Sequence, residues 1–228
     1  MKGEIKTKFI SLMVIMGIFL MLPNCCKQDE DNTVIDIDGN IYQTITLGTQ
    51  IWMAENLKTI KYNDDTPISM VTDNTSWSNL TSPAYCYYDN DETMYKNTYG
   101  VLYNWYAVNT GKLCPIGWHV PTVADWDLMI EYLGGEDVAG GKLKEAGLAH
   151  WADPNTGATN ETGFTALPGG FRNYDGTFYD VGDLGYCWSA TENDATSAWY
   201  SYLHYYDSSV GKTNGSKKYG FSVRCIKD

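Results

Sequence analysis

Basic residues are scarce in this chain of 228 residues. Its 16 Lys and Arg stand against 28 Asp and Glu, which gives a formal net charge of -12. Nucleic acids are bound through clustered Lys and Arg, so this balance argues against a nucleic-acid partner. The hydrophobic share of 43% is enough for a packed core and excludes a wholly disordered chain. The length is typical of a single domain.

Patterns that mark metal and catalytic sites are also missing. The histidines His119, His150 and His204 are scattered and no Cys-x-x-Cys pair accompanies them, so zinc-type spacing is absent. No Gly-x-Ser-x-Gly segment marks a nucleophile. Residues 36–40 and 153–157 hold oxygen ligands at alternate positions but lack the bidentate acid of a calcium loop, so we interpret them as turns. The sequence therefore predicts no catalytic residue, no metal site and no cofactor.

No apolar run is long enough for a comfortable membrane span. The run at residues 9–22 follows Lys2, Lys6 and Lys8, and a basic start before a short apolar run is typical of a secretory signal. Leu22 stands three residues before Cys25, which resembles a bacterial lipobox. We therefore predict a lipoprotein signal peptide over 1–24 and a lipidated Cys25; a plain signal peptide is the alternative.

A polar, acidic stretch follows Cys25. It cannot pack, so we predict a flexible tether over residues 25–33, followed by one domain over 34–228. An acidic run after a lipidated Cys resembles the surface-export signal of Bacteroidetes lipoproteins, although a merely solvated linker explains it too. We expect an outer-membrane lipoprotein at the cell surface, attached to the membrane by its lipid anchor only.

Strand patterns open and close the domain. Apolar runs at 34–37 and 41–47 flank an Asp-Gly turn, which predicts a hairpin, and residues 50–53 continue the pattern. Residues 60–100 show little periodicity and are interpreted as long loops, with short strands near 85–88 and 101–107. Further strands are expected, in chain order, over residues 186–189, 199–203 and 221–225.

Helices are few in this pattern. Thr122 and Asp125 form a shortened capping box before Trp126, Met129 and Leu133, which recur at helical spacing and predict one buried apolar face. A weaker helix is expected over 137–146, where two glycines disfavour it. With strands at both ends and one or two helices between, the fold class is α+β.

Seven ordered segments together resemble the Fibrobacter succinogenes major paralogous domain (FISUMP) over about residues 34–228. The segments are Asp36-x-Asp38-Gly39-Asn40-x-Tyr42, Trp52-Met53-Ala54-Glu55-Asn56-Leu57, Tyr99-Gly100-x-Leu102-Tyr103-Asn104-Trp105, Cys114-Pro115-x-Gly117-Trp118-His119-Val120-Pro121-Thr122, Gly163-Phe164-x-Ala166-Leu167-Pro168-Gly169-Gly170, Trp188-Ser189-x-Thr191-Glu192 and Gly220-Phe221-Ser222-Val223-Arg224-Cys225. The resemblance implies a C-type lectin-like fold, with one or two helices, twisted antiparallel strands and long loops. The family has no established general activity.

The resemblance also assigns roles to individual residues. In the related lectin fold a disulfide joins the region of the first helix to the last strand, which implies Cys114–Cys225. Whether Cys86 and Cys187 also pair is left open by the sequence. Buried positions are implied for Trp105, Trp118, Trp126 and Trp188. His119 is expected to be a structural hydrogen-bonding group. The sugar- and calcium-binding signatures of true C-type lectins are absent, so their chemistry is not carried over.

The segment 193–219 differs from the rest. Seventeen of its 27 residues are Asn, Asp, Thr, Ser, Tyr or His, the composition of antibody-like binding surfaces. Adenine-directed mutation of Asn codons by a diversity-generating retroelement yields the same residues, although an ordinary polar hairpin does too. We predict that eight residues contact ligand: Asn193, Asp194, Thr196, Ser201, His204, Tyr206, Asp207 and Ser208.

These patterns predict a surface-anchored module that binds a glycan or a protein, as in adhesion. Two alternatives remain, an enzyme that modifies surface polysaccharide or protein and a structural subunit of a fimbria-like assembly. An enzyme requires a deep pocket with converging polar groups of shifted pKa. A binding module requires a shallow aromatic and polar face, and a structural subunit requires an exposed strand edge or groove.

Overall fold

The computed structural model describes residues 32–228. The predicted signal peptide, Cys25 and nearly all of the predicted tether lie outside the described residues. The first strand begins at Thr33, the last residue of that tether. Within the described part, no helix is long and apolar enough to cross a membrane. The architecture is α+β, with more strand than helix, as the sequence predicts.

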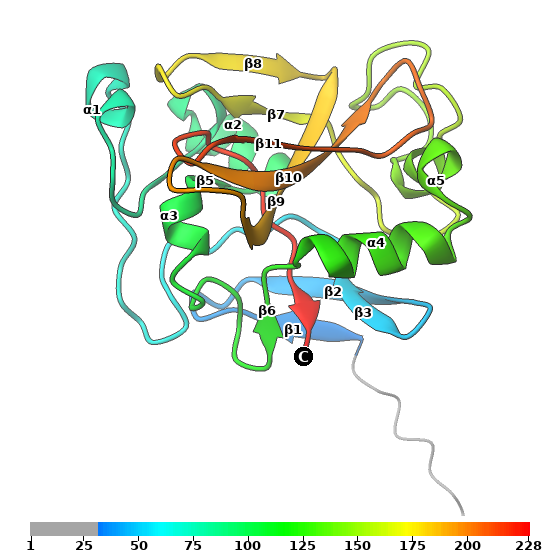
Figure 1. Ribbon diagram of the computed structural model, residues 1–228, viewed down its shortest axis with the longest axis horizontal. Helices are drawn as coiled ribbons and strands as arrows, with labels where there is room; N and C mark the ends of the chain where they lie inside the picture. Colours follow the sequence, from blue (N-terminus) through cyan, green and yellow to red (C-terminus); the bar gives the residue numbers. More distant parts are fainter. Residues whose placement is uncertain (1–31) are drawn as a thin grey trace, which may run out of the picture. The chain divides into compact units, whose positions relative to one another are not determined.

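The first sheet contains the chain's start and end. Its strand order is β1-β2-β3-β12-β6, and all pairs are antiparallel (Figure 1). The strands are β1 (Thr33–Ile35), β2 (Ile41–Leu47), β3 (Gln50–Met53), β6 (Trp118–His119) and β12 (Ile226–Lys227). The predicted hairpin is confirmed. Its turn is held by the Asp36 carboxylate, which accepts hydrogen bonds from Asn40 N (2.9 Å) and the Tyr42 hydroxyl (2.5 Å), so residues 36–40 form a turn rather than a cation loop.

The second sheet forms the upper layer in Figure 1, with strand order β11-β10-β9-β7-β8. Its strands are β7 (Gly169–Arg172), β8 (Phe178–Val181), β9 (Leu184–Glu192), β10 (Ser197–His204) and β11 (Gly211–Ser216). Only β7 and β9 pair in parallel. The strands predicted at 186–189 and 199–203 are confirmed within β9 and β10. A further pair, β4 (Tyr85–Cys86) with β5 (Leu102–Tyr103), lies apart from both sheets.

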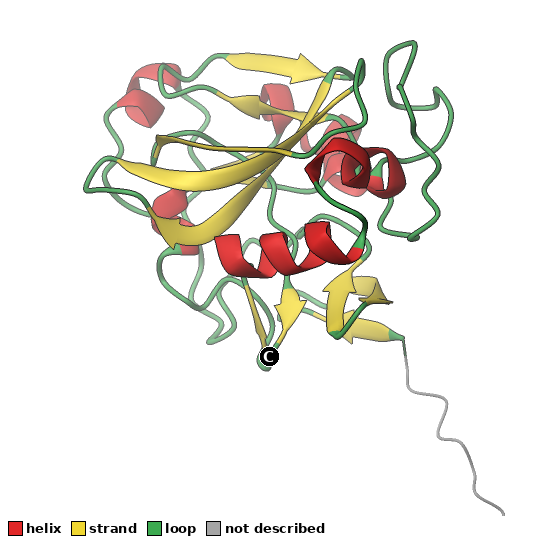
Figure 2. Cartoon of the chain, turned by 45° about the vertical axis from the view of Figure 1, so that its right-hand side comes forward, coloured by secondary structure: helices red, strands yellow, loops and turns green. Residues whose placement is uncertain are grey.

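Helix α4 (Val123–Tyr132) lies between the two sheets, as Figure 2 shows. Its capping box is complete, because Thr122 Oγ1 accepts from Asp125 N while the Asp125 carboxylate accepts from Thr122 N. Trp126 and Met129 are buried as predicted, and they pack with Trp52 of the first sheet and Leu203 of the second. The second predicted helix is α5 (Glu136–Leu143), which ends three residues early.

The expectation of one or two helices was wrong, because the described residues form five α-helices. The additional ones are α1 (Asn74–Ser78), α2 (Glu92–Tyr99) and α3 (Trp105–Val108), with a 3-10 turn η1 (Tyr88–Asn90) between α1 and α2. The strand expected over 101–107 stops at Tyr103, because the Asn104 side chain accepts from Ala107 N and starts α3. The strand expected over 221–225 is reduced to isolated bridges, such as Phe221 with Tyr103, before β12 begins.

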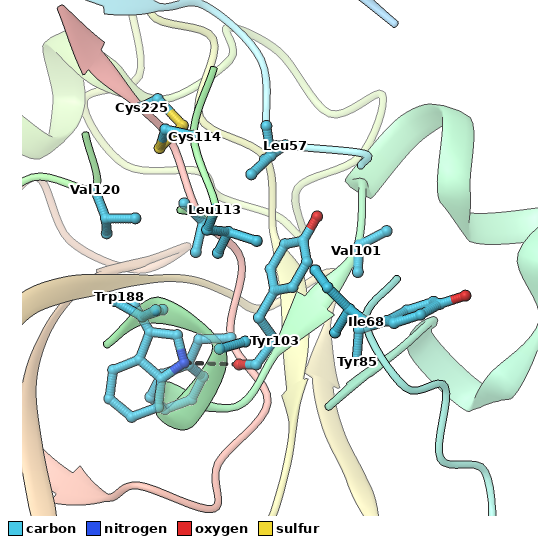
Figure 3. Packing of buried hydrophobic residues seen from close by; sticks show 14 of the residues in the cluster. Leu57, Ile68, Tyr85, Val101, Tyr103, Leu113, Cys114, Val120, Trp188 and Cys225 are labelled. Atoms are coloured by element: carbon cyan, nitrogen blue, oxygen red, sulfur yellow. Dashed lines mark hydrogen bonds between the residues drawn. A yellow bond between two sulfur atoms is a disulfide. The ribbon is translucent and has the colours of Figure 1, made fainter. Parts of the chain in front are cut away.

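The core contains the predicted disulfide. Cys114 and Cys225 are bonded, with their Cα atoms 5.9 Å apart (Figure 3). Cys86 and Cys187, whose pairing the sequence leaves open, are both free thiols. Cys86 is packed in a cluster with Trp77 and Tyr88, whereas Cys187 packs against the cluster around α4, so different parts of the core hold the two thiols.

The expected tryptophan positions are largely confirmed. Trp105, Trp126 and Trp188 are buried, and Trp188 Nε1 donates to Tyr103 O at 2.8 Å (Figure 3). Trp118 is half-buried on β6 and packs against the main cluster. Its neighbour His119 is a structural hydrogen-bonding group, with Nδ1 2.7 Å from Asp228 Oδ1.

Candidate functional site

Strand β10 presents two different faces. Side chains alternate along a strand, so Tyr200, Tyr202 and His204 share one face while Ser201 and Leu203 share the other. Ser201 and Leu203 are 4% and 8% exposed and face the α4 side of the sheet. The tyrosines and His204 are only half-buried. The outer face of β10 is therefore a row of aromatic rings that solvent reaches.

This row belongs to an open hollow of about 380 Å³. Residues of β8 to β11 and the β8–β9 turn line it, and we name them the tyrosine face: Asp180, Leu184, Tyr186, Tyr200, Tyr202, His204 and Thr213. Tyr186 on β9 is the cross-strand partner of Tyr202, and their ring centroids lie 6.3 Å apart. Tyr200 lies 6.0 Å from Tyr186 and 6.2 Å from Tyr202. The three rings thus form one continuous aromatic surface.

Two glycines of β11 allow the tyrosine rings to lie flat against the sheet. Gly211 pairs directly with Tyr202, and a Cβ built at Gly211 would stand 2.1 Å from the Tyr202 Cζ. A Cβ at Gly215 would meet the Tyr219 ring at 2.6 Å and the Tyr200 ring at 3.1 Å. Any side chain at these two positions would displace the rings. The Tyr202 and Tyr200 rings therefore lie over the glycine backbone of β11.

The rings rest on a buried aromatic floor. Phe221 is 1% exposed and stacks on Tyr186 with centroids 5.0 Å apart and an interplanar angle of 7°. Phe221 also lies 4.6 Å from the Tyr200 ring. The Tyr186 hydroxyl donates to Asp180 Oδ2 at 2.8 Å. Burial, together with this bond, raises the pKa of Tyr186, so its hydroxyl remains protonated and fixed in place.

His204 closes one end of the tyrosine face. Its ring stacks on Tyr206 with centroids 4.3 Å apart, and Tyr206 itself is 53% exposed. Burial lowers the pKa of His204, so the imidazole is neutral at pH 7. Among the described residues, His204 Nδ1 is one of the few buried polar atoms without a hydrogen-bond partner.

Lys144 fixes the loop that carries this end. Its Nζ donates to the carbonyl oxygens of His204 (2.8 Å), Asp207 (2.7 Å) and Thr156 (3.0 Å). Burial lowers the pKa of Lys144 to about 8. Ser208 Oγ adds a bond to Asp137 O at 2.8 Å, which ties the loop to α5. The loop is thus held through its backbone carbonyls and through the Ser208 side chain.

The eight predicted ligand residues do not form one cluster. Asn193, Asp194 and Thr196 lie in the β9–β10 turn, and the 204–208 group lies at the other end of β10, about 23 Å away at strand rise. Asp194 accepts from Thr196 N and Ser197 N; these bonds lower its pKa and show a turn-forming role. The expectation that Ser201 contacts ligand was wrong, because strand alternation turns it inward.

Of the tyrosine face, only His204 is among the eight predicted ligand residues. Tyr200, Tyr202 and Thr213 lie within the segment 193–219 but were not predicted as contacts. Asp180, Leu184 and Tyr186 precede that segment, and the pairing of β9 with β10 brings Tyr186 beside Tyr202. The alternation of Tyr200, Tyr202 and His204 was a usable signal, since period two places all three on one face. The choice of outer and inner face was not readable from the segment alone.

A second cavity, below the sheet, is small and largely apolar. It holds about 20 Å³, room for about one water, and its lining includes Trp126, Phe164 and Leu203. Within residues 32–228, no group of three or more His, Cys, Asp or Glu is arranged to hold a metal ion. The tyrosine face is distinguished from this cavity by its open shape and by its lining of three tyrosine rings and a histidine.

Comparison with known proteins gives one result. The family model of the Fibrobacter succinogenes major domain matches residues 45–227. The chain belongs to this family. No curated protein and no solved structure matches the chain.

In this Fibrobacter succinogenes major domain, the segments that carry the family resemblance meet in the interior. Arg224 Nε donates to Asn56 Oδ1 at 2.9 Å, and Arg224 Nη2 donates to Thr165 O at 2.9 Å. Arg224 is 1% exposed and lies over the Phe164 ring. The residues of the tyrosine face lie outside those segments. The domain thus combines a buried framework built from these segments with a face built from residues outside them.

Proposed function

We propose that this chain is a surface-anchored binding protein whose tyrosine face takes an extracellular glycan or protein. The observation that carries the proposal is the row of flat, half-exposed rings over Gly211 and Gly215. Rigid aromatic side chains supply contact area at low cost in conformational entropy, and neighbouring polar groups supply hydrogen bonds. The α+β architecture and the Cys114–Cys225 bond support a C-type lectin-like fold as part of the same proposal.

The cellular location is part of this proposal. The basic start, the short apolar run and Leu22 before Cys25 support a lipid anchor in the outer membrane, and the acidic stretch after it supports surface exposure. In Figure 1 the second sheet, whose strands carry the tyrosine face, lies on the other side of α4 from β1, the first strand of the described residues.

We also propose that residues 193–219 form a diversified surface. Of their 17 Asn, Asp, Thr, Ser, Tyr and His residues, all but Ser201 keep some solvent exposure, so substitutions there disturb the core little. The flanking DNA decides the matter. A template repeat of this segment beside a reverse-transcriptase gene is expected; a genome without both contradicts diversification and leaves the binding proposal standing.

The binding proposal is tested with the double variant Tyr200→Ala, Tyr202→Ala. We expect at least a tenfold loss of binding on arrays of immobilised glycans and extracellular proteins. Tyr132→Ala is the control, since Tyr132 is 61% exposed on α4, away from the tyrosine face. Binding that is unchanged in the double variant while the fold is intact contradicts the proposal.

A different observation favours the structural-subunit alternative. Strand β1 is a sheet edge, and a groove of about 250 Å³ beside it is lined by residues that include Ile35, Ile37 and Ile116. These three side chains are 57%, 45% and 84% exposed. An apolar groove beside the outermost strand of the described sheet suits an extended segment from a partner protein. Ile35→Lys would block such pairing and leave binding at the tyrosine face unchanged.

A further inference from the structure

We infer that the ligand of the tyrosine face is a neutral glycan, whose sugar rings stack on Tyr200 and Tyr202. This inference rests on the proposed function and names its ligand class. The half-buried rings of Tyr200 and Tyr202 line the open hollow, and the π face of an aromatic ring carries negative charge density. The C–H bonds on one side of a pyranose ring are polarised by the ring's oxygens and carry partial positive charge. The two surfaces are therefore complementary in shape and in charge.

The polar groups of the tyrosine face suit hydroxyls rather than ions. Of the described residues that line it, one is an acid, Asp180, and none is a Lys or Arg. Its imidazole, His204, is neutral at pH 7 because burial lowers its pKa. The hydroxyls of Thr213 and the tyrosines both donate and accept hydrogen bonds, as sugar hydroxyls do. An anionic glycan would meet the Asp180 carboxylate and a chain of net charge -12.

The size of the hollow favours a glycan over a protein partner. About 380 Å³ is within the range of small-ligand sites. A specific protein partner usually covers roughly 800 Å² on each side, which the seven lining residues do not supply alone. A short run of sugar rings, one for each exposed tyrosine, fits the row of Tyr200 and Tyr202 along β10.

The ring orientation can be tested apart from the ring chemistry. Gly211→Ala keeps Tyr202 but lifts its ring from the sheet, since the new Cβ would meet the far end of that side chain. Tyr202→Phe keeps the ring and removes the hydroxyl. Gly169→Ala is the matched control in the same sheet, because its Cβ would meet its neighbours only at ordinary contact distances of 3.4–3.7 Å.

The probes are immobilised neutral hexasaccharides of glucose, galactose, mannose and xylose, beside uronic-acid hexamers of the same length. We expect binding to at least one neutral series and at least tenfold weaker binding to the uronic acids. Tyr202→Ala and Gly211→Ala should each weaken neutral binding at least tenfold, and Tyr202→Phe less than threefold. The double variant Tyr202→Ala, Gly211→Ala should lose no more than Tyr202→Ala alone, because both changes remove the same stacking.

Each outcome separates the inference from the proposed function. Stronger binding to uronic acids, or full binding by Gly211→Ala, overturns the inference. A protein ligand that depends on Tyr202 in the absence of glycan binding overturns the inference and supports the proposed function. Glycan binding that stays unchanged in every variant of the tyrosine face overturns both the inference and the proposed function. Melting temperatures of all variants, measured in parallel, identify any loss that is due to unfolding.

Discussion

Buried positive charges are held by carbonyl oxygens in this domain. Arg172 is fully buried; it donates to Val71 O (2.5 Å) and Thr72 O (2.8 Å) and lies 4.4 Å from the Trp77 ring centroid. Lys144 and Arg224 likewise donate to backbone carbonyl oxygens and lie over an aromatic ring. A buried charge costs much free energy unless it is hydrogen-bonded. Each cation therefore fixes segments that are distant in sequence.

Lys144 gives the stability of the domain a specific pH dependence. Burial lowers its pKa from about 10.5 to about 8, so the native state releases this proton at lower pH than the unfolded chain. Between about pH 8 and 10.5 the unfolded state binds more protons, and the contribution of Lys144 to stability rises with pH. Lys144→Met cannot titrate. Urea denaturation at pH 7, 8, 9 and 10 should show the wild type gaining stability relative to this variant; a constant difference would refute the shift.

Local signals predicted helices only where they coincided with an apolar face. Helix α4 has both a capping box and buried residues on one side. Helix α2 has a capping Asp91 but no buried residue, so its sequence carries no apolar stripe for a pattern to detect. Helix α3 has only four residues, and its start depends on Asn104, whose amide also donates to Ser82 O. Short helices of this kind are set by their surroundings.

The capping box of α4 makes a measurable contribution. Thr122→Ala removes the oxygen that accepts from Asp125 N, and we expect it to lower the free energy of unfolding by about 1 kcal/mol. Thr122→Ser keeps that oxygen and should remain within a few tenths of the wild type. Equilibrium denaturation of the three proteins checks this, and an equal loss in both variants would assign the effect to the methyl group instead.

At the scale of the whole domain, the C-terminal segment connects the separate sheets. Residues 220–227 bridge β5 through Phe221, β9 through Ser222 and the first sheet through β12. The disulfide fastens this segment to Cys114, 111 residues earlier. The end of the chain therefore links both sheets and the loop before β6.

Loss of this disulfide should destabilise the domain strongly. Closing a loop of that length restricts the unfolded chain and contributes roughly 4–5 kcal/mol in the chain-entropy model. The double variant Cys114→Ala, Cys225→Ala should lose that much in equilibrium denaturation. Cys187→Ala is the control, since it removes a free thiol and closes no loop. Alkylation of the unfolded, unreduced chain should modify Cys86 and Cys187 and spare Cys114 and Cys225.

The sequence by itself determined the parts whose signals are local. Alternating apolar residues around an Asp-Gly turn predicted the first hairpin, and the capping box predicted α4, because both patterns depend on neighbours a few residues apart. The family segments predicted the disulfide, and the family model confirms the membership. Alternation also places Tyr200, Tyr202 and His204 on one side of β10, a local signal that the sequence prediction did not use.

Only the tertiary structure decided which side of that strand is outside. Pairing of β10 with β9 brought Tyr186 beside Tyr202, and packing of α4 under the sheet turned Ser201 inward. Pairing with β11 placed Gly211 beneath the Tyr202 ring and made it lie flat. Cross-strand register and the packing of layers depend on contacts between distant residues, so a single segment does not encode them.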